Sequence, residues 1–178
     1  MSVGRAARRD ATLTAIKQAA RDLVRSEGPD GIGLRAVARR LDLTAPALYR
    51  YVASHQDLID LVVADVYDEL CAVLEDAVAR APEDPGVQLE AASRAFRRWA
   101  LAHRPEFGLV FAHPIPPEES PRTVDAGKAR FARVFGRLFA ELWRTRPFPV
   151  PTTLRPDVAR QVEARASAYV PGLPVGAA

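Results

Sequence analysis

The chain has 178 residues and a mass of 19.4 kDa, with 48% hydrophobic, 26% charged and 7% aromatic residues, the composition of a soluble globular protein. Its net charge of +3 and pI of about 9.4 exclude little by themselves. No apolar run reaches the roughly 20 residues of a membrane-spanning helix, and the N-terminus lacks the apolar segment of a signal peptide. The single cysteine, Cys71, excludes an intrachain disulfide and a multi-cysteine zinc site, which fits a reducing cytoplasm.

The positive charge is concentrated at the start of the chain. Residues 1–52 contain ten Lys/Arg and five Asp/Glu, a net +5 that leaves −2 for the rest of the chain. An excess confined to one segment indicates a polyanionic partner for that segment. The alternative is a solvated basic face without a partner.

Hydrophobic periodicity predicts helices throughout and no strands. In chain order, the predicted helices cover residues 10–27, 34–41, 44–52, 54–80, 87–103, 105–112, 123–144 and 157–169. Thr44 is predicted to cap the third helix, and Ser54 with Asp57 forms a variant capping box at the start of the fourth. A loop at residues 82–86 divides two lobes, and a proline-rich loop covers residues 113–121. We therefore expect an all-α protein.

Two short helices joined by a brief turn, from Gly33 to Val52, have helix-turn-helix spacing. In this motif the second helix enters the major groove of DNA while the first crosses the phosphates. Ala45 and Ala47 are small, so the backbone of the second helix can approach the bases closely.

The N-terminal lobe resembles the DNA-binding domain of the tetracycline-repressor (TetR) family of bacterial transcriptional regulators. The resemblance covers about residues 9–69 and is most specific in the LYRYV sequence that begins at Leu48. It implies a three-helix DNA-binding domain (residues 9–69), joined by a long helix to a C-terminal helical domain for effector binding and dimerisation (residues 82–170). No cofactor or metal is implied.

The family pattern assigns DNA contacts to individual residues. Arg35 stands where the family reaches a base or a nearby phosphate, and Tyr49 stands at its phosphate-binding tyrosine, with core packing as the alternative. The full set of expected DNA-binding residues is Arg35, Thr44, Ala45, Pro46, Ala47, Tyr49, Arg50, Tyr51 and His55.

Three residues depart from the family pattern. Asp42 replaces a turn glycine, although Asp tolerates a left-handed backbone better than most residues. Gly33 replaces a Ser or Thr cap. His55 replaces a phosphate-binding lysine, so we expect weaker affinity that falls further as the ring deprotonates, while the helix N-terminus can still hold a phosphate.

The second lobe resembles the family's effector domain more loosely, through the WALAHRPEFGLVF sequence and the proline loop that follows. The resemblance implies a pocket for a small-molecule effector, and ordinary core packing is the alternative for each candidate. The candidate pocket residues are Trp99, His103, Phe107, Phe111, Phe131 and Phe135. A metal site at His103, Glu106 and His113 is disfavoured because Pro105 and Pro114 disturb helical ligand spacing.

The expected function is a cytoplasmic repressor that binds a palindromic DNA operator as a homodimer and is released by a small molecule. Family members close with two long helices that pair across the dimer, whereas this sequence ends after one modest helix, so dimerisation is in doubt. The alternatives are a shortened regulator that acts through mixed dimers and a small helical enzyme that uses His103 and Glu106. No glycine-rich phosphate loop, nucleophile elbow or HExxH motif supports catalysis.

Overall fold

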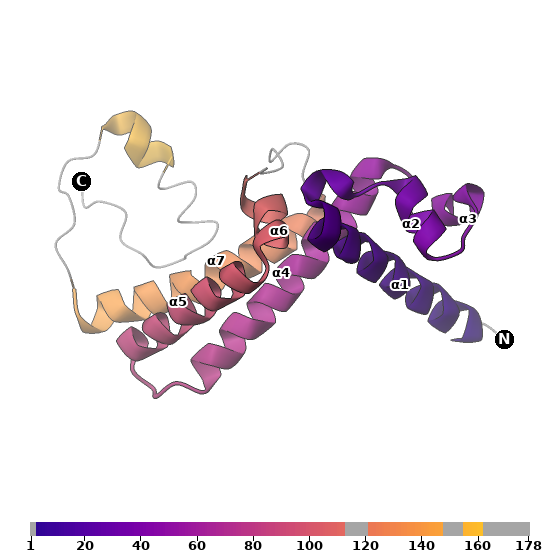
Figure 1. Ribbon diagram of the computed structural model, residues 1–178. Coiled ribbons are helices and arrows are strands. Elements are labelled where there is room, and N and C mark those ends of the chain that lie inside the picture. The colour runs from indigo at the N-terminus through magenta and orange to yellow at the C-terminus, as the bar shows by residue number, and fades with distance from the viewer. Residues whose placement is uncertain (1–2, 113–120, 148–154, 162–178) are drawn as a thin grey trace. The chain divides into compact units, whose positions relative to one another are not determined.

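The computed structural model describes residues 3–112, 121–147 and 155–161, and every regular element in these ranges is helical (Figure 1). The elements are α1 (Val3–Glu27), the 3-10 helix η1 (Pro29–Gly31), α2 (Leu34–Arg40), α3 (Ala45–Tyr49), α4 (His55–Ala79), α5 (Pro85–Ala102), α6 (Arg104–Phe107), the π-helical segment η2 (Gly108–Ala112), α7 (Arg122–Thr145) and a helical turn at residues 156–161. The predicted all-α class is confirmed. No helix in the described ranges is long and apolar enough to cross a membrane.

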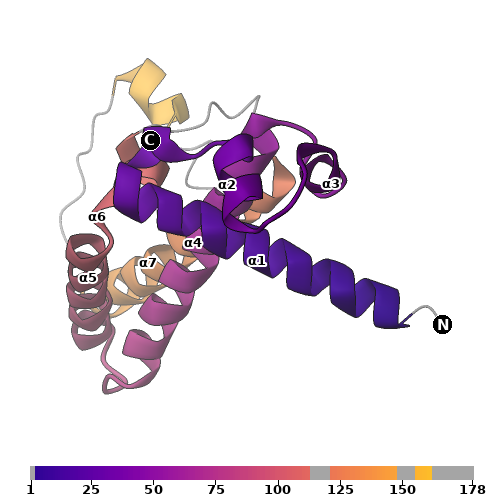
Figure 2. The ribbon, with the colours of Figure 1, turned by 45° about the vertical axis from the view of Figure 1, so that its right-hand side comes forward.

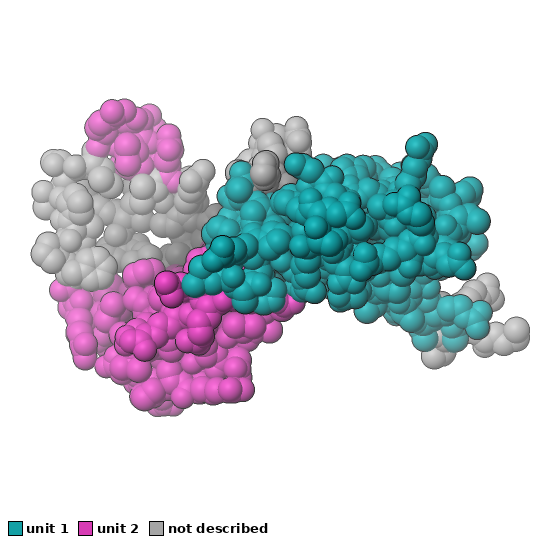
Figure 3. Space-filling view, in the orientation of Figure 1, with its two compact units in different colours: residues 1–68, 100–125 teal, residues 69–99, 126–178 magenta. Residues whose placement is uncertain are grey.

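The chain forms two compact units, coloured separately in Figure 3. Unit 1 comprises residues 1–68 and 100–125, and unit 2 comprises residues 69–99 and 126–178. The long helix α4 contributes its first part to unit 1 and its second part to unit 2.

Unit 1 is built around one apolar face of α1. Ile16, Ala20 and Val24 recur at helical spacing and are fully buried, as are Val62 and Val66 of α4. The helix ends at Glu27 because Gly28 follows with φ +84°, a conformation that L side chains rarely adopt. Figure 2 shows α3 nearly end-on beyond α2, with α1 crossing in front of α4.

Unit 2 packs α5 and α7 against the second part of α4. Its core contains Val78 of α4, Ala92 of α5 and Leu138 of α7, with Val134 and Phe135 packed against them. Phe96, Phe131 and Phe135 also contact one another, with ring centroids 5.5 to 6.3 Å apart. Val134, Phe135 and Leu138 of the apolar stripe predicted for the helix at residues 123–144 therefore lie on the core of this unit, whereas Phe139 is 41% exposed.

Several helix boundaries differ from those predicted. The first helix begins at Val3 rather than Asp10. The residues before Asp10 include the strong helix formers Ala and Arg, which extend the helix, but they have no apolar periodicity from which a helix could be predicted. The third ends at Tyr49 rather than Val52, where the N–H groups of Tyr51 and Val52 both bond back to the Leu48 carbonyl. The predicted helix at residues 105–112 is divided into α6 and η2. Residues 113–120 of the predicted proline loop, and the predicted last helix beyond residue 161, lie outside the described residues.

Candidate nucleic-acid interface

The turn between α2 and α3 has the geometry that the motif requires. Asp42 has φ +52°, and among the described residues it is the only non-glycine residue with a positive φ. The N–H of Leu43 then bonds to the Ala38 carbonyl at 2.9 Å, which closes the turn. Asp42 therefore takes the left-handed conformation expected of the residue that replaces the family glycine.

The start of α3 is capped as the sequence predicts. Thr44 is the N-cap, and its hydroxyl accepts a hydrogen bond from the Ala47 N–H at 3.3 Å. Pro46 is tolerated because it lies in the first turn. Leu48 is 1% exposed and anchors the helix in the core, while Thr44, Ala45 and Pro46 are exposed and Ala47 is half-buried. The outer face of α3 is therefore small and accessible.

Tyr49 lies at the end of α3 and is 53% exposed. Such exposure argues against the alternative in which the ring is a core residue. Arg50 is also exposed, and the half-buried ring of Tyr51 lies beneath the guanidinium of Arg9, which is 5.4 Å from the ring centroid. Sequence reasoning did not single out Arg9, although Arg9 lies within the segment that resembles the family.

Exposed arginines flank this surface. Arg35 and Arg39 lie four residues apart on α2, and so share one face of the helix. Neither of them, nor Arg50, forms an ion pair with a carboxylate in the part of the chain that the structure describes. Their charges are available to an anion such as a DNA phosphate. Arg39 was not among the residues that the family pattern assigned.

The start of α4 is held by a variant capping box. The Asp57 N–H donates to the Ser54 hydroxyl at 3.0 Å, and the Asp57 carboxylate accepts from the Ala53 N–H at 3.1 Å. In a regular capping box this carboxylate would accept a hydrogen bond from the N–H of the cap residue itself, here Ser54. The predicted cap is therefore confirmed, with its return bond displaced by one residue.

His55 uses one ring nitrogen inside the protein. Its Nε2 lies 2.8 Å from the Ile32 carbonyl oxygen, which can only accept, so Nε2 carries the proton and donates. This bond joins the start of α4 to the segment before α2. Nδ1 has no hydrogen-bond partner among the described residues.

The six candidate pocket residues are divided between the two units. Phe107 and Phe111 are in contact in unit 1, with centroids 4.8 Å apart, and Phe111 also contacts Tyr67. His103 is the N-cap of α6. In unit 2, Phe131 and Phe135 belong to the aromatic core, and the Trp99 indole N–H donates to Glu69 at 2.9 Å.

A groove of about 1150 Å³ lies in unit 2, apart from these candidates. Val78, Val134, Ala140 and Trp143 supply apolar parts of its lining. The charged residues that line it are Glu75, Glu83, Arg133, Arg137, Glu141 and Arg144. None of the six candidates lines this groove.

The residues considered for metal binding or catalysis have other environments. No group of three or more metal-ligating side chains occurs in the described ranges. Glu106 is fully buried, and its Oε1 accepts a hydrogen bond from Arg25, so the carboxylate is part of an internal ion pair. His113 lies outside the described residues.

Comparison with known families and proteins agrees with this architecture. Residues 16–62 match the family described as bacterial regulatory proteins of the tetR family, and residues 89–169 match the tetracyclin repressor-like C-terminal domain. The HTH-type transcriptional regulator Rv1816 of Mycobacterium tuberculosis is 34% identical over 116 residues, which are 63% of this chain and 47% of that protein. The chain thus spans about half the length of the curated relatives it matches.

Solved structures show the same fold. A protein of unknown function from Rhodococcus sp. RHA1 matches with a TM-score of 0.68 and 22% identity, over 92% of this chain and 87% of that one. PfmR, a TetR family transcriptional regulator from Thermus thermophilus, matches with a TM-score of 0.57 and 19% identity, over 91% and 87% of the two chains. With both family domains matched in order along a helix-turn-helix structure, the chain belongs to the TetR family of bacterial regulatory proteins.

Proposed function

We propose that this protein is a DNA-binding transcriptional regulator that represses by occupying an operator. The observation that carries this proposal is the small, exposed outer face of α3, set on a buried Leu48 and flanked by Arg35 and Arg50 without internal ion pairs. Alanine side chains at positions 45 and 47 let the backbone of α3 approach the base edges, where they offer apolar contact to a thymine methyl group.

The remaining candidates fix the position of the protein on the duplex. In this proposal Arg35 reaches a guanine edge or a nearby phosphate, and the hydroxyl groups of Thr44, Tyr49 and Tyr51 bond to the backbone. The N–H groups at the start of α4, beside His55, hold a further phosphate. Residues 9–69 act as the DNA-binding domain, and residues 82–170 act in effector binding and dimerisation.

The proposed operator is palindromic and is bound by a homodimer. Two copies of α3 related by a two-fold axis read half-sites about 34 Å apart, one turn of the duplex. The competing proposal is a regulator that does not repress and acts through mixed dimers with other chains. The oligomeric state in solution separates the two, because a stable monomer favours the mixed-dimer proposal.

Release by a small molecule is part of the proposal. The groove in unit 2 supports it, since a volume of about 1150 Å³ accommodates a drug-sized ligand and apolar walls with a few charged groups are typical of ligand sites. Trp99, His103, Phe107, Phe111, Phe131 and Phe135 remain the predicted pocket residues of the family pattern.

The experiment that tests this function is enrichment of duplexes from a random-sequence DNA library by the full chain, with light scattering to establish its mass in solution. We expect a dimer that enriches one palindromic sequence with half-sites about 10 base pairs apart. A reporter gene placed behind that sequence is expected to be silenced by the protein. A chain that enriches no sequence contradicts the proposal.

A further inference from the structure

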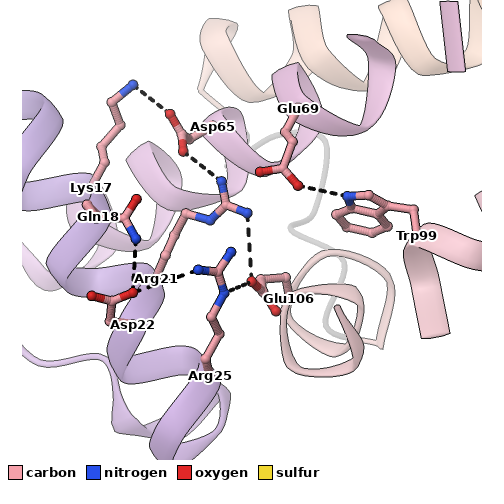
Figure 4. Close-up of polar contacts among 9 residues, drawn as sticks. All are labelled: Lys17, Gln18, Arg21, Asp22, Arg25, Asp65, Glu69, Trp99 and Glu106. Atoms are coloured by element: carbon pink, nitrogen blue, oxygen red, sulfur yellow. Dashed lines mark hydrogen bonds and ion pairs between the residues drawn. The ribbon is translucent and has the colours of Figure 1, made fainter. Parts of the chain in front are cut away.

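A buried carboxylate on α6 lies against two arginines of α1, as Figure 4 shows. Glu106 is 0% exposed, and its Oε1 accepts a hydrogen bond from Nε of Arg25 at 2.5 Å and lies 3.7 Å from Nη2 of Arg21. The other oxygen, Oε2, is buried without a hydrogen-bond partner among the described residues. Burial of a charge with incomplete hydrogen bonding is destabilising unless its counter-charges remain in place.

Two series of ion pairs lead from Glu106 into the DNA-binding helices. In the first, Arg25 also lies 3.8 Å from Asp22, whose second carboxylate oxygen lies 3.5 Å from Arg40. Arg40 is the last residue of α2 and directly precedes the turn of the helix-turn-helix motif. This series therefore joins α6 to α2.

The second series joins α6 to α4. Arg21 is 5% exposed, and its Nη1 donates a hydrogen bond to Asp65 of α4 at 3.1 Å. The other oxygen of Asp65 accepts from Lys17 at 2.8 Å. All residues of both series belong to unit 1.

Stability alone does not explain the cluster of charged residues formed by Glu106, Arg21 and Arg25. A well-packed apolar residue of similar volume at a buried ion pair is often neutral or stabilising, whereas removal of one partner leaves an uncompensated charge. The position of a single carboxylate thus determines whether Arg21 and Arg25 share a buried counter-charge or pair only with Asp65 and Asp22. In the chain, α6 follows directly on α5, whose residues up to Trp99 belong to unit 2.

We propose that Glu106 is a positioning residue for DNA binding, a proposal that rests on the function proposed above. Through Arg25 and Asp22 it holds Arg40 and the end of α2, and through Arg21 and Asp65 it holds α1 on α4. When the carboxylate is lost or withdrawn, Arg25 turns fully to Asp22 and competes with Arg40 for it. The helix-turn-helix then occupies its DNA-competent arrangement for a smaller fraction of the time, which lowers the apparent affinity.

The test compares full-length Glu106→Gln with the wild-type chain on a duplex that the wild-type chain has enriched from a random library. Glutamine retains the shape of the side chain and removes its charge. The matched control is Glu90→Gln, the same change at an exposed residue of α5 that pairs only with Arg94 among the described residues. Fluorescence anisotropy measures affinity, and circular dichroism measures the folded fraction and the melting temperature.

We expect Glu106→Gln to weaken binding by roughly tenfold, a magnitude typical of coupling between sites, and Glu90→Gln to leave it unchanged. Asp22→Asn provides a second measurement, because Asp22 touches Arg25 and Arg40 but not Glu106. Both changes interrupt the same series of ion pairs, so their effects on DNA affinity are not expected to be additive. The double variant is expected to bind DNA more tightly than the product of the two single fold-changes would give. If the role of Glu106 were purely structural, the two changes would be non-additive in melting temperature but additive in DNA affinity.

A folded Glu106→Gln variant with wild-type affinity overturns the proposal, as does strict additivity of the two changes in DNA affinity. If Glu106→Gln does not fold, Asp22→Asn alone decides, and wild-type affinity of that variant overturns the proposal. Failure of the wild-type chain to enrich any duplex refutes the proposed function itself, and this inference with it. If the wild-type chain enriches a duplex and the Glu106→Gln variant binds that duplex with unchanged affinity, only the inference is refuted.

Discussion

The guanidinium of Arg9 lies 5.4 Å from the centre of the Tyr51 ring, and Nη1 of Arg9 donates a hydrogen bond to the Arg50 carbonyl at 3.5 Å. These contacts join the early turns of α1 to the segment that follows α3. The N-terminal part of α1, which has no apolar periodicity, is thereby attached to the residues that directly follow α3. Tyr51 has a structural role in this arrangement in addition to its proposed contact with the DNA backbone.

Two substitutions separate these roles of Tyr51. Tyr51→Leu removes the aromatic face and is expected to lower the free energy of unfolding by about 0.5–1 kcal/mol, the usual value of a cation–π contact that is not fully desolvated. Tyr51→Phe retains the face and is expected to unfold like the wild-type chain in urea while binding DNA more weakly by about 1 kcal/mol. Equal stability of the Leu and Phe variants would show that the Arg9 contact contributes nothing.

The left-handed backbone at Asp42 makes a second prediction. Asp42 is exposed, so its replacement changes backbone strain with little change in packing. Asp42→Val is expected to lower the free energy of unfolding by about 1–2 kcal/mol, the cost of this conformation for an ordinary L residue. Asp42→Gly is expected to be at least as stable as the wild-type chain. Urea denaturation of the three proteins checks this, and a Val variant of wild-type stability would refute it.

Arg35 is predicted to act at the DNA and not in the fold. Arg35→Gln is expected to weaken binding of an enriched duplex by about 1–3 kcal/mol if the guanidinium pairs with a guanine. Its melting temperature is expected to stay unchanged, because the exposed side chain forms no ion pair with a described residue. Arg97→Gln, the same change at an exposed position of α5, serves as the control. Equal effects of the two variants on DNA affinity would mean that Arg35 contributes only general charge.

Glu75 makes unit 2 sensitive to acid. Hydrogen bonds from Arg130, at 2.8 and 2.5 Å, hold the pKa of the Glu75 carboxyl below its usual 4.5, with smaller contributions from the charges of Arg133 and Arg137. Because the pKa is lower in the folded state, the stabilisation is complete above the unfolded pKa and is lost as the pH falls through the folded pKa. The loss therefore occurs below about pH 4.5.

Comparison of Glu75→Gln with the wild-type chain measures this effect. Both partners are partly exposed, so solvent screening limits the contribution to about 1 kcal/mol or less. The wild-type chain is expected to be the more stable at pH 6, and the difference in the free energy of unfolding is expected to shrink at pH 3. A difference that stays constant between these pH values would contradict the assignment.

Local chemistry made much of unit 1 predictable from the sequence. The cap at Thr44 and the box at Ser54 depend on residues at most four positions apart, so their spacing is visible in the chain. The left-handed turn at Asp42 followed from comparison with the family pattern. The start of α1 was misplaced because an exposed helical segment without apolar periodicity resembles a loop. The exposure of Tyr49 followed from the family pattern and not from periodicity.

The ion pairs around Glu106 could not be predicted in this way. Glu106 and Arg25 are separated by 81 positions, and an acidic residue in an apolar segment has no sequence signature that names its partner. The same limit applies to the candidate pocket. Phe107 and Phe135 both have the aromatic character of a pocket, yet they belong to different units, and the groove of unit 2 is lined by neither.

The salt dependence of DNA binding tests the central claim most directly. The enriched duplex is titrated with the full chain between 50 and 200 mM salt, and log K is plotted against log salt concentration, with a scrambled duplex as control. If Arg35 and Arg39 of α2 and Arg50, which follows α3, neutralise phosphates, log K falls steeply on both duplexes, by nearly one unit of slope per phosphate contact, and the enriched duplex stays the tighter at every salt concentration. A flat salt dependence, or equal affinity for the two duplexes throughout, would contradict the assignment of this surface to DNA.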